Sequence, residues 1–307
     1  MTDAPLHRTG PGGSIYDLGY QGYEGPRLGR QAAIRALFWH TVRSCYGIGR
    51  GGRAKIAPIT LSVLALLPAI VGVGIAALAA QTGTGEFIDE ASPIRYDSYH
   101  GMVSTLVGLF CAAQAPELLG RDQRYSVLPI YFSRALARLD YTIAKILGLI
   151  VSLLVLVLVP YLVLFVGRVF VAPDPISGFT TELPSLPPIV AQALLVSTLL
   201  GSLSMAISAF TPRRAFATAG IIAALIIPPI IVAIVHELTR SDIGSFLVLL
   251  SPPDVLDGTN AMLFDVRSES PAVQESDFGA LAFIGAAVVG AAIAVGLTIR
   301  RYLRIAV

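Results

Sequence analysis

A chain of 307 residues in which 54% are hydrophobic and only 14% are charged is too apolar for an ordinary soluble domain, where about 25% are charged. The composition indicates an integral membrane protein, and the length allows about six spans of about 20 residues each. The net charge of +2 excludes no class of partner. Two cysteines and four scattered histidines offer neither a disulfide framework nor metal-ligand spacing, so we expect no metal site.

Residues 1–29 are rich in Gly, Pro and Tyr and lack a helical period. We expect a flexible cytoplasmic tail, and a docking arm for a cytoplasmic partner is the alternative. The first apolar run starts only near Ile56, which is too late for a secretory signal peptide. The N-terminus is therefore expected to stay in the cytoplasm.

Residues 30–55 are expected to form an elbow helix followed by a basic, Gly-rich hinge. From Ile34 to Cys45, apolar residues recur at i, i+3, i+4, i+8 and i+11, and most basic residues lie elsewhere on the helical wheel. A helix packed on a soluble domain would show the same pattern, but the position before the first span favours the inner membrane interface. The residues expected at this interface are Arg35, Phe38, Trp39 and Arg43.

Six apolar runs of span length fill residues 56–307, which predicts an all-α integral membrane domain. No internal repeat is visible, and this argues against an inverted-repeat secondary transporter. The predicted spans are approximately 56–80, 99–119, 141–170, 189–210, 215–235 and 278–299.

The basic residues predict the orientation of the spans. If both termini, the 120–140 loop and the 211–214 turn share one side, that side carries 18 of the 22 Lys and Arg residues. Cytoplasmic loops are enriched in Lys and Arg, so both termini are predicted to be cytoplasmic. The longest outward segment, 236–277, is partly apolar; re-entrant or interfacial helices at 243–277 and an ordinary folded loop are both compatible with it. The basic residues on the outer side are Arg95, Arg168, Arg240 and Arg267.

Familiar catalytic motifs are missing from the sequence. There is no G-x-x-x-x-G-K-[ST] loop and no G-x-S-x-G or H-E-x-x-H pattern, so we expect neither an enzyme nor a cofactor bound by this chain. The predicted spans nearly lack acidic residues and carry hydroxyl groups instead, which suits a hydrophobic or amphiphilic substrate better than a small ion. A small-residue face on the fourth span indicates close helix packing, with a translocation lining as the alternative. The residues considered for such a lining are Gln114, Gln192, Ser197, Ser204 and Ser208.

The segment 117–145 gathers five basic and three acidic residues in an otherwise apolar chain. A solvated loop that obeys the positive-inside rule would explain the sign of the charge, but not the ordered spacing that follows. After Pro129, a stripe that could meet lipid phosphates or an acidic protein surface recurs at i, i+4, i+7 and i+11: Arg134, Arg138, Tyr141 and Lys145. The polar residues expected to act with it upstream are Glu117, Arg121, Asp122 and Arg124.

This segment resembles the loop after the second span of ABC-2 type exporter permeases. That loop commonly carries an acidic residue, a short helix and an Arg-rich stretch ending in Tyr and Lys. The elbow helix, the six spans and the outer segment before the last span also fit, so the resemblance covers most of residues 30–307. Arg124-Tyr125 departs from a frequent Gly-Thr pair, and Ala135 from a frequent Pro. The matching positions are Asp122 or Glu117, Ser133-Arg134, Arg138, Tyr141 and Lys145.

The resemblance implies a bacterial plasma-membrane permease subunit, with export as the expected direction. It implies that a separate ATPase subunit, which binds ATP and Mg²⁺, docks on the 117–145 segment and that a second permease copy, identical or related, completes the assembly. Membrane lipid is an expected contact and nucleic acid is not. An ATPase-independent secondary transporter or channel is the alternative; a lipid-modifying enzyme would need a polar catalytic cluster, and a structural scaffold would transport nothing.

Overall fold

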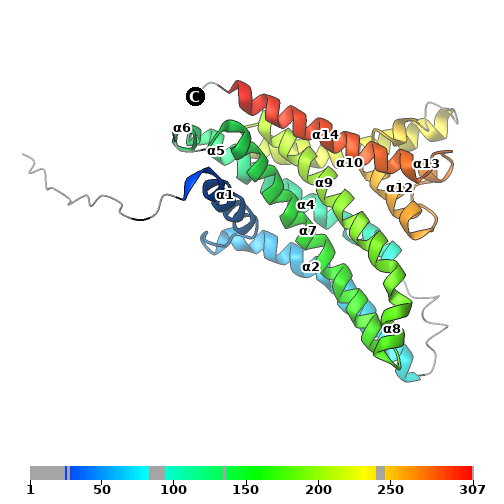
Figure 1. Ribbon diagram of the computed structural model, residues 1–307. Helices are drawn as coiled ribbons and strands as arrows, with labels where there is room; N and C mark the ends of the chain where they lie inside the picture. The colour runs from blue at the N-terminus through cyan, green and yellow to red at the C-terminus, as the bar shows by residue number, and fades with distance from the viewer. Residues whose placement is uncertain (1–24, 26–27, 83–93, 134–135, 240–245, 306–307) are drawn as a thin grey trace, which may run out of the picture.

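The protein is described from a computed structural model that places residues 25, 28–82, 94–133, 136–239 and 246–305 (Figure 1). Within these ranges every regular element is a helix, so the prediction of an all-α fold is confirmed. The predicted N-terminal tail, residues 1–29, lies largely outside the described residues.

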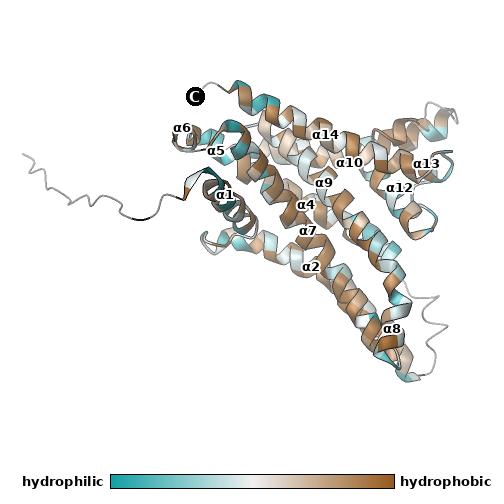
Figure 2. Cartoon of the chain, in the orientation of Figure 1, coloured by the Kyte–Doolittle hydropathy of each residue, from teal (hydrophilic) through white to brown (hydrophobic). Residues whose placement is uncertain are grey.

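Six helices in the described part of the chain are long and apolar enough to cross a membrane, and each contains one of the predicted spans or most of it. Figure 2 shows apolar residues along these helices and more hydrophilic residues near the helix ends. The protein is therefore treated as a six-span membrane protein. The six helices are α2 (Arg53–Thr82), α4 (Tyr96–Ala115), α7 (Arg138–Val171), α9 (Leu186–Phe210), α10 (Arg214–Thr239) and α14 (Ala280–Arg304).

Helices α4, α7 and α9 form the centre of the bundle, because half or more of the residues in the most apolar stretch of each are buried. Helices α2, α10 and α14 surround them, and most of their apolar side chains are exposed or half-buried. Such faces are unfavourable in water and suit contact with lipid or with another apolar helix.

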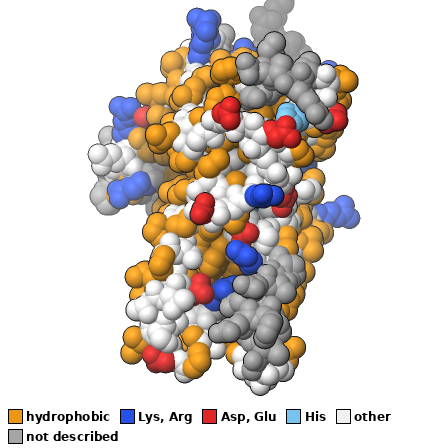
Figure 3. All heavy atoms as spheres, turned by 90° about the vertical axis from the view of Figure 1, so that its right-hand side faces the viewer, with side chains coloured by type: hydrophobic (Ala, Val, Ile, Leu, Met, Phe, Trp, Pro, Cys, Tyr) orange, Lys and Arg blue, Asp and Glu red, His pale blue; other side chains and the backbone are white. Residues whose placement is uncertain are grey.

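The two ends of the bundle carry different short elements (Figure 1). One end holds α5 (Arg121–Arg124), α6 (Leu128–Phe132), the start of α1 (Gly29–Cys45) and the end of α14. The other end holds α8 (Pro175–Glu182), α12 (Pro252–Phe264) and α13 (Pro271–Gln274), and Figure 3 shows Asp and Glu side chains spread among apolar ones there. We call these the basic end and the acidic end.

The long segment predicted to face outward folds inward over part of its length. Helix α12 packs against α4, α9, α10 and α14, and most of its side chains from Asp254 to Ala261 are buried. Gln192 of α9 donates a hydrogen bond to the Leu256 carbonyl at 3.0 Å and accepts one from Thr259 at 2.9 Å. These bonds hold α12 among the spans, so this part of the segment is not an ordinary surface loop.

Helix α1 packs along the first part of α7. Its buried face is formed by Leu37, Thr41, Ser44 and Cys45, while Trp39 is 56% exposed. At the start of the contact, Arg30 forms a bidentate ion pair with Asp140, at 2.7 and 2.8 Å. The expected amphipathic helix is present as a helix, and its role at the membrane interface stays a prediction; Arg35, Phe38, Trp39 and Arg43 are exposed or half-buried.

The contact between α1 and α7 depends on a glycine. A Cβ atom at Gly148 would lie 2.5 Å from the Thr41 methyl group, whereas a Cβ at Gly285 of α14 would meet nothing within 4 Å. We expect Gly148→Val to destabilise the purified protein by about 1–3 kcal/mol through overpacking. Gly285→Val, which makes the same change in helix propensity, should have little effect. Thermal unfolding in detergent measures the difference, and equal shifts for the two variants would contradict this account of the α1 contact.

Candidate coupling site and central cavity

Helix α4 continues without a break into the polar segment at the basic end. A π-helical turn, η1 (Pro116–Gly120), joins α4 to α5, so that residues 96–124 form one rod. The rod stops at Ser126, which adopts a left-handed conformation with φ 52°. The Val127 amide bonds back to the Asp122 carbonyl at 3.1 Å and the Ser126 amide to the Gln123 carbonyl at 3.2 Å, the pattern of a Schellman cap. The chain therefore turns sharply here into α6.

A buried lysine ties this rod to α7. The Lys145 side chain is 5% exposed, and its ammonium group lies 2.8 Å from Asp122 Oδ2. It also donates a hydrogen bond to the Leu118 carbonyl of the π turn at 3.1 Å. The Tyr141 hydroxyl donates to the same Asp122 oxygen at 2.6 Å. Because a buried charge is costly unless it is paired and hydrogen-bonded, these contacts fix α5 against α7.

A second ion pair ties the π turn to α10. Glu117 accepts from Arg214 at 2.6 Å and lies 3.7 Å from Arg50, which belongs to the hinge between α1 and α2. Gly120 packs against the backbone of Pro212 in the turn between α9 and α10, where a Cβ atom would lie 3.3 Å from the Pro212 carbonyl oxygen. The π turn thus contacts α10, the hinge between α1 and α2, and the turn between α9 and α10.

The last helix joins the same network. Gln123 Nε2 donates to the Tyr302 hydroxyl at 2.7 Å, and the Tyr302 ring lies 5.6 Å from the Tyr141 ring. Arg138 at the start of α7 donates to the Leu303 carbonyl at 2.9 Å. A displacement of α5 would therefore act on α4, α7, α10 and α14 through these contacts.

The structure separates the predicted coupling residues into two groups. It brings Glu117, Asp122, Tyr141 and Lys145 together inside the network described above. Arg121 and Arg124 are exposed, Arg138 binds the end of α14, and Arg134 lies outside the described residues. The expectation of a surface stripe through Tyr141 and Lys145 is wrong, because α7 is a central helix and both side chains face the bundle.

A cavity of about 950 Å³ lies between the α1 hinge and the 117–131 segment. Its lining includes the basic residues Arg43, Arg50 and Arg121, together with the paired Lys145. Tyr125 and Ile130 also line it, and both are largely exposed, at 65% and 61%. Burial lowers the pKa of His40, another lining residue, which favours its neutral form.

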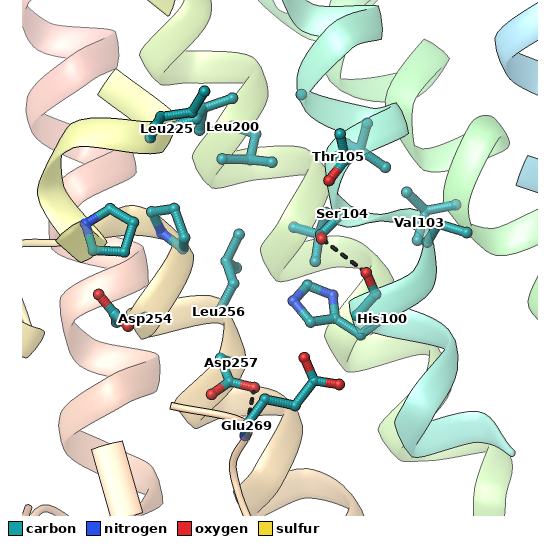
Figure 4. A pocket seen from close by; sticks show the side chains of 18 of the residues that line it. His100, Val103, Ser104, Thr105, Leu200, Leu225, Asp254, Leu256, Asp257 and Glu269 are labelled. Carbon is teal, nitrogen blue, oxygen red and sulfur yellow. Dashed lines mark hydrogen bonds between the residues drawn. The ribbon is translucent and has the colours of Figure 1, made fainter. Parts of the chain in front are cut away.

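A second cavity, of about 500 Å³, lies between α4, α7, α9, α10 and α12 (Figure 4). Most of its lining is apolar, with Val103, Val157, Leu200 and Leu225 as members. We call it the central cavity. At one end His100, Asp257 and Glu269 lie together, and Ser104 and Thr105 lie further along α4.

The charged groups of the central cavity come from α12 and the connection that follows it. Asp257 accepts hydrogen bonds from the Ser270 amide at 3.1 Å, from the Glu269 amide and from the Ser268 hydroxyl, so it orders the backbone that carries Glu269. Asp254 is 5% exposed, and its Oδ2 accepts no hydrogen bond from the described residues. Burial raises the pKa of Asp254 and nearby Asp257 adds to the rise, while the Ser251 and Ser270 side chains oppose it.

The residues considered for a translocation lining lie elsewhere. Gln192, Ser197, Ser204 and Ser208 are buried on α9, and none of them lines the central cavity; neither does the buried Gln114 of α4. Ser197 donates to the carbonyl of residue 193 at 2.7 Å, as hydroxyl groups in helices commonly do. The sequence does not predict the acidic lining of the central cavity, because nothing in a polar outward segment indicates that α12 folds back among the spans.

A search against protein-family models finds no match for this chain, and a search of curated proteins finds no significant relative. The functional argument therefore depends on the geometry of the two cavities and of the buried network.

The Lys145 network predicts a specific pattern of stability. Lys145→Met should destabilise the protein by about 3–5 kcal/mol, because it leaves the Asp122 carboxylate partly buried without its cation. Adding Asp122→Asn should recover part of that loss. Lys55→Met changes the other lysine of the chain, which is exposed, and serves as the control. Thermal unfolding of these variants, of Asp122→Asn alone and of the wild type tests the coupling, and additive effects of the two network substitutions would argue against it.

Proposed function

We propose that this chain is the membrane subunit of an ATP-driven transporter, an ABC-2 type permease that exports an amphiphilic or hydrophobic substrate. A separate ATPase subunit docks at the basic end and supplies the energy, and a second permease copy completes the assembly. In this proposal the basic end faces the cytoplasm of a bacterium, in keeping with the concentration of Lys and Arg residues there.

The observation that carries the proposal is the continuous rod from α4 to α5. Its first half lines the central cavity at His100, Ser104 and Thr105, and its end is fixed to α7 and α10 by the Lys145 and Glu117 ion pairs. A rigid element that reaches from an exposed tip to a cavity can transmit a displacement between them. This connection supports energy coupling from the tip.

The exposed tip of the rod, formed by Arg121, Arg124, Tyr125 and Ile130, has the character of a docking surface. Tyr125 and Ile130 expose apolar side chains at a helix turn, and Arg121 and Arg124 place positive charge beside them. Exposed aromatic and aliphatic anchors surrounded by charge are typical of protein interfaces, in which the apolar centre supplies most of the affinity. A partner with an acidic rim and an apolar groove would fit this surface.

Substitutions at the tip should weaken docking of the ATPase without affecting folding of the membrane subunit. We expect Tyr125→Asp with Ile130→Asp to weaken association with a co-expressed, co-encoded ATPase by about tenfold or more, because both apolar anchors are lost. The membrane subunit itself should still insert and show the wild-type unfolding temperature, since both side chains are exposed. Leu281→Asp with Met262→Asp makes the same number of exposed apolar-to-acidic changes away from the tip and should leave association intact.

Two outcomes would contradict the proposal. The first is wild-type protein that associates with no co-encoded ATPase. The second is substrate transport by the chain alone in proteoliposomes driven by an ion gradient, which would favour the secondary-transporter alternative.

A further inference from the structure

The central cavity has the shape and lining of a site for an organic molecule. Its volume of about 500 Å³ lies within the range of small-molecule pockets, and side chains from five helices form its walls. Val103 and Val107 of α4, Val157 of α7 and Leu200 of α9 give it an apolar surface. A ligand that fills it would bury an apolar body.

The charged lining of the cavity has one sign. Three carboxyl groups, those of Asp254, Asp257 and Glu269, line it together with His100, and none of the described residues that line it is Lys or Arg. Apolar walls of low dielectric strengthen the field of these carboxylates, because little water screens them. The cavity therefore attracts positive charge.

Asp254 differs from the other two carboxyl groups. Asp257 is satisfied by the backbone amides and the hydroxyl group of residues 268–270. Asp254 is more than nine-tenths buried, yet its Oδ2 has no hydrogen-bond donor among the described residues. A buried carboxyl oxygen without a donor is costly, and a cation beside it would remove that cost.

We propose that the central cavity is the substrate site of the transporter and that it binds amphiphilic organic monocations, with the cationic centre against Asp254 and the apolar body against α4, α7 and α9. The inference depends on the proposed function, since it names the substrate class of the same protein. Asp257 holds the loop that closes the acidic end of the site and Glu269 adds negative charge there.

The position of Glu269 supports this division of roles. A Cβ atom at Gly101 would lie 2.5 Å from Glu269 Oε1, so α4 has no side chain where that carboxylate rests. Glu269 is exposed at the cavity edge and Asp254 is buried deeper. A cation bound beside Asp254 would thus pass Glu269 as it leaves toward the acidic end.

Direct binding to the purified chain tests the inference without the ATPase. The probe is radiolabelled tetraphenylphosphonium, measured by equilibrium dialysis against detergent-solubilised protein, with empty micelles subtracted. Tetraphenylborate has nearly the same size and shape with the opposite charge, and we expect it not to compete. Wild-type protein should bind the cation saturably.

The variants separate charge from structure. Asp254→Asn keeps the shape of the side chain and should weaken cation binding by about tenfold or more, as expected for loss of a charged partner. Glu269→Gln should weaken it less. Asp265→Asn makes the same chemical change at an exposed position with φ 53°, which asparagine tolerates, and should bind as wild type does. Leu225→Trp should reduce binding by filling the apolar part of the cavity.

Each outcome decides the question. Absence of saturable binding by folded wild-type protein, equal competition by tetraphenylborate, or unchanged binding by Asp254→Asn would overturn the inference. If Asp254→Asn does not fold, Leu225→Trp and the borate competition still test it. If the chain binds the cation but associates with no ATPase, the cation site is supported and the ATP-driven mechanism is overturned. Failure of the cation site can therefore be distinguished from failure of the proposed function.

Discussion

The architecture of the basic end depends on one buried ammonium group. Lys145 lies near the start of a central helix, where water cannot solvate it, so the surrounding chain must supply oxygen atoms. The Asp122 carboxylate and the Leu118 carbonyl do so, and both belong to the continuation of α4. The π turn places that carbonyl and that carboxylate on the same side of the rod as α7. Since π turns occur often at functional sites, the position of this one agrees with a mechanical role for the segment.

Helix α4 gives the two cavities a common wall. Its first half carries His100 and Ser104 into the central cavity, and its extension carries Glu117 and Asp122 into the lining of the cavity at the basic end. Helices α7 and α9 pack closely, since a Cβ atom at Gly201 of α9 would lie 3.0 Å from Ile150 of α7. Closely packed helices move as units, so a push on α5 is expected to change the walls of the central cavity and not to be absorbed locally.

Hydropathy predicted the helical elements well and the polar contacts poorly, for a physical reason. Span length and apolar runs are local properties, so the six long helices and the elbow helix could be located from residue order alone. Lys145 and Asp122 lie 23 positions apart in the sequence and on opposite sides of a turn, so helical periodicity cannot predict their pairing. The spacing of Arg138, Tyr141 and Lys145 predicts a surface stripe, whereas α7 is a central helix and buries Tyr141 and Lys145. The acidic lining was invisible because it depends on α12 folding back among the spans.

Two aspartates of this chain differ in the partners that the described residues give them. Asp122 has a lysine, a tyrosine hydroxyl and a place in a network that spans the basic end, so its charge is balanced within the chain. Asp254 is at least as buried, and its Oδ2 faces no donor in the described part of the chain. The chain thus satisfies the Asp122 carboxylate from within, whereas it leaves one oxygen of Asp254 without a hydrogen bond at a cavity wall. This difference agrees with the proposal that a cation binds reversibly beside Asp254.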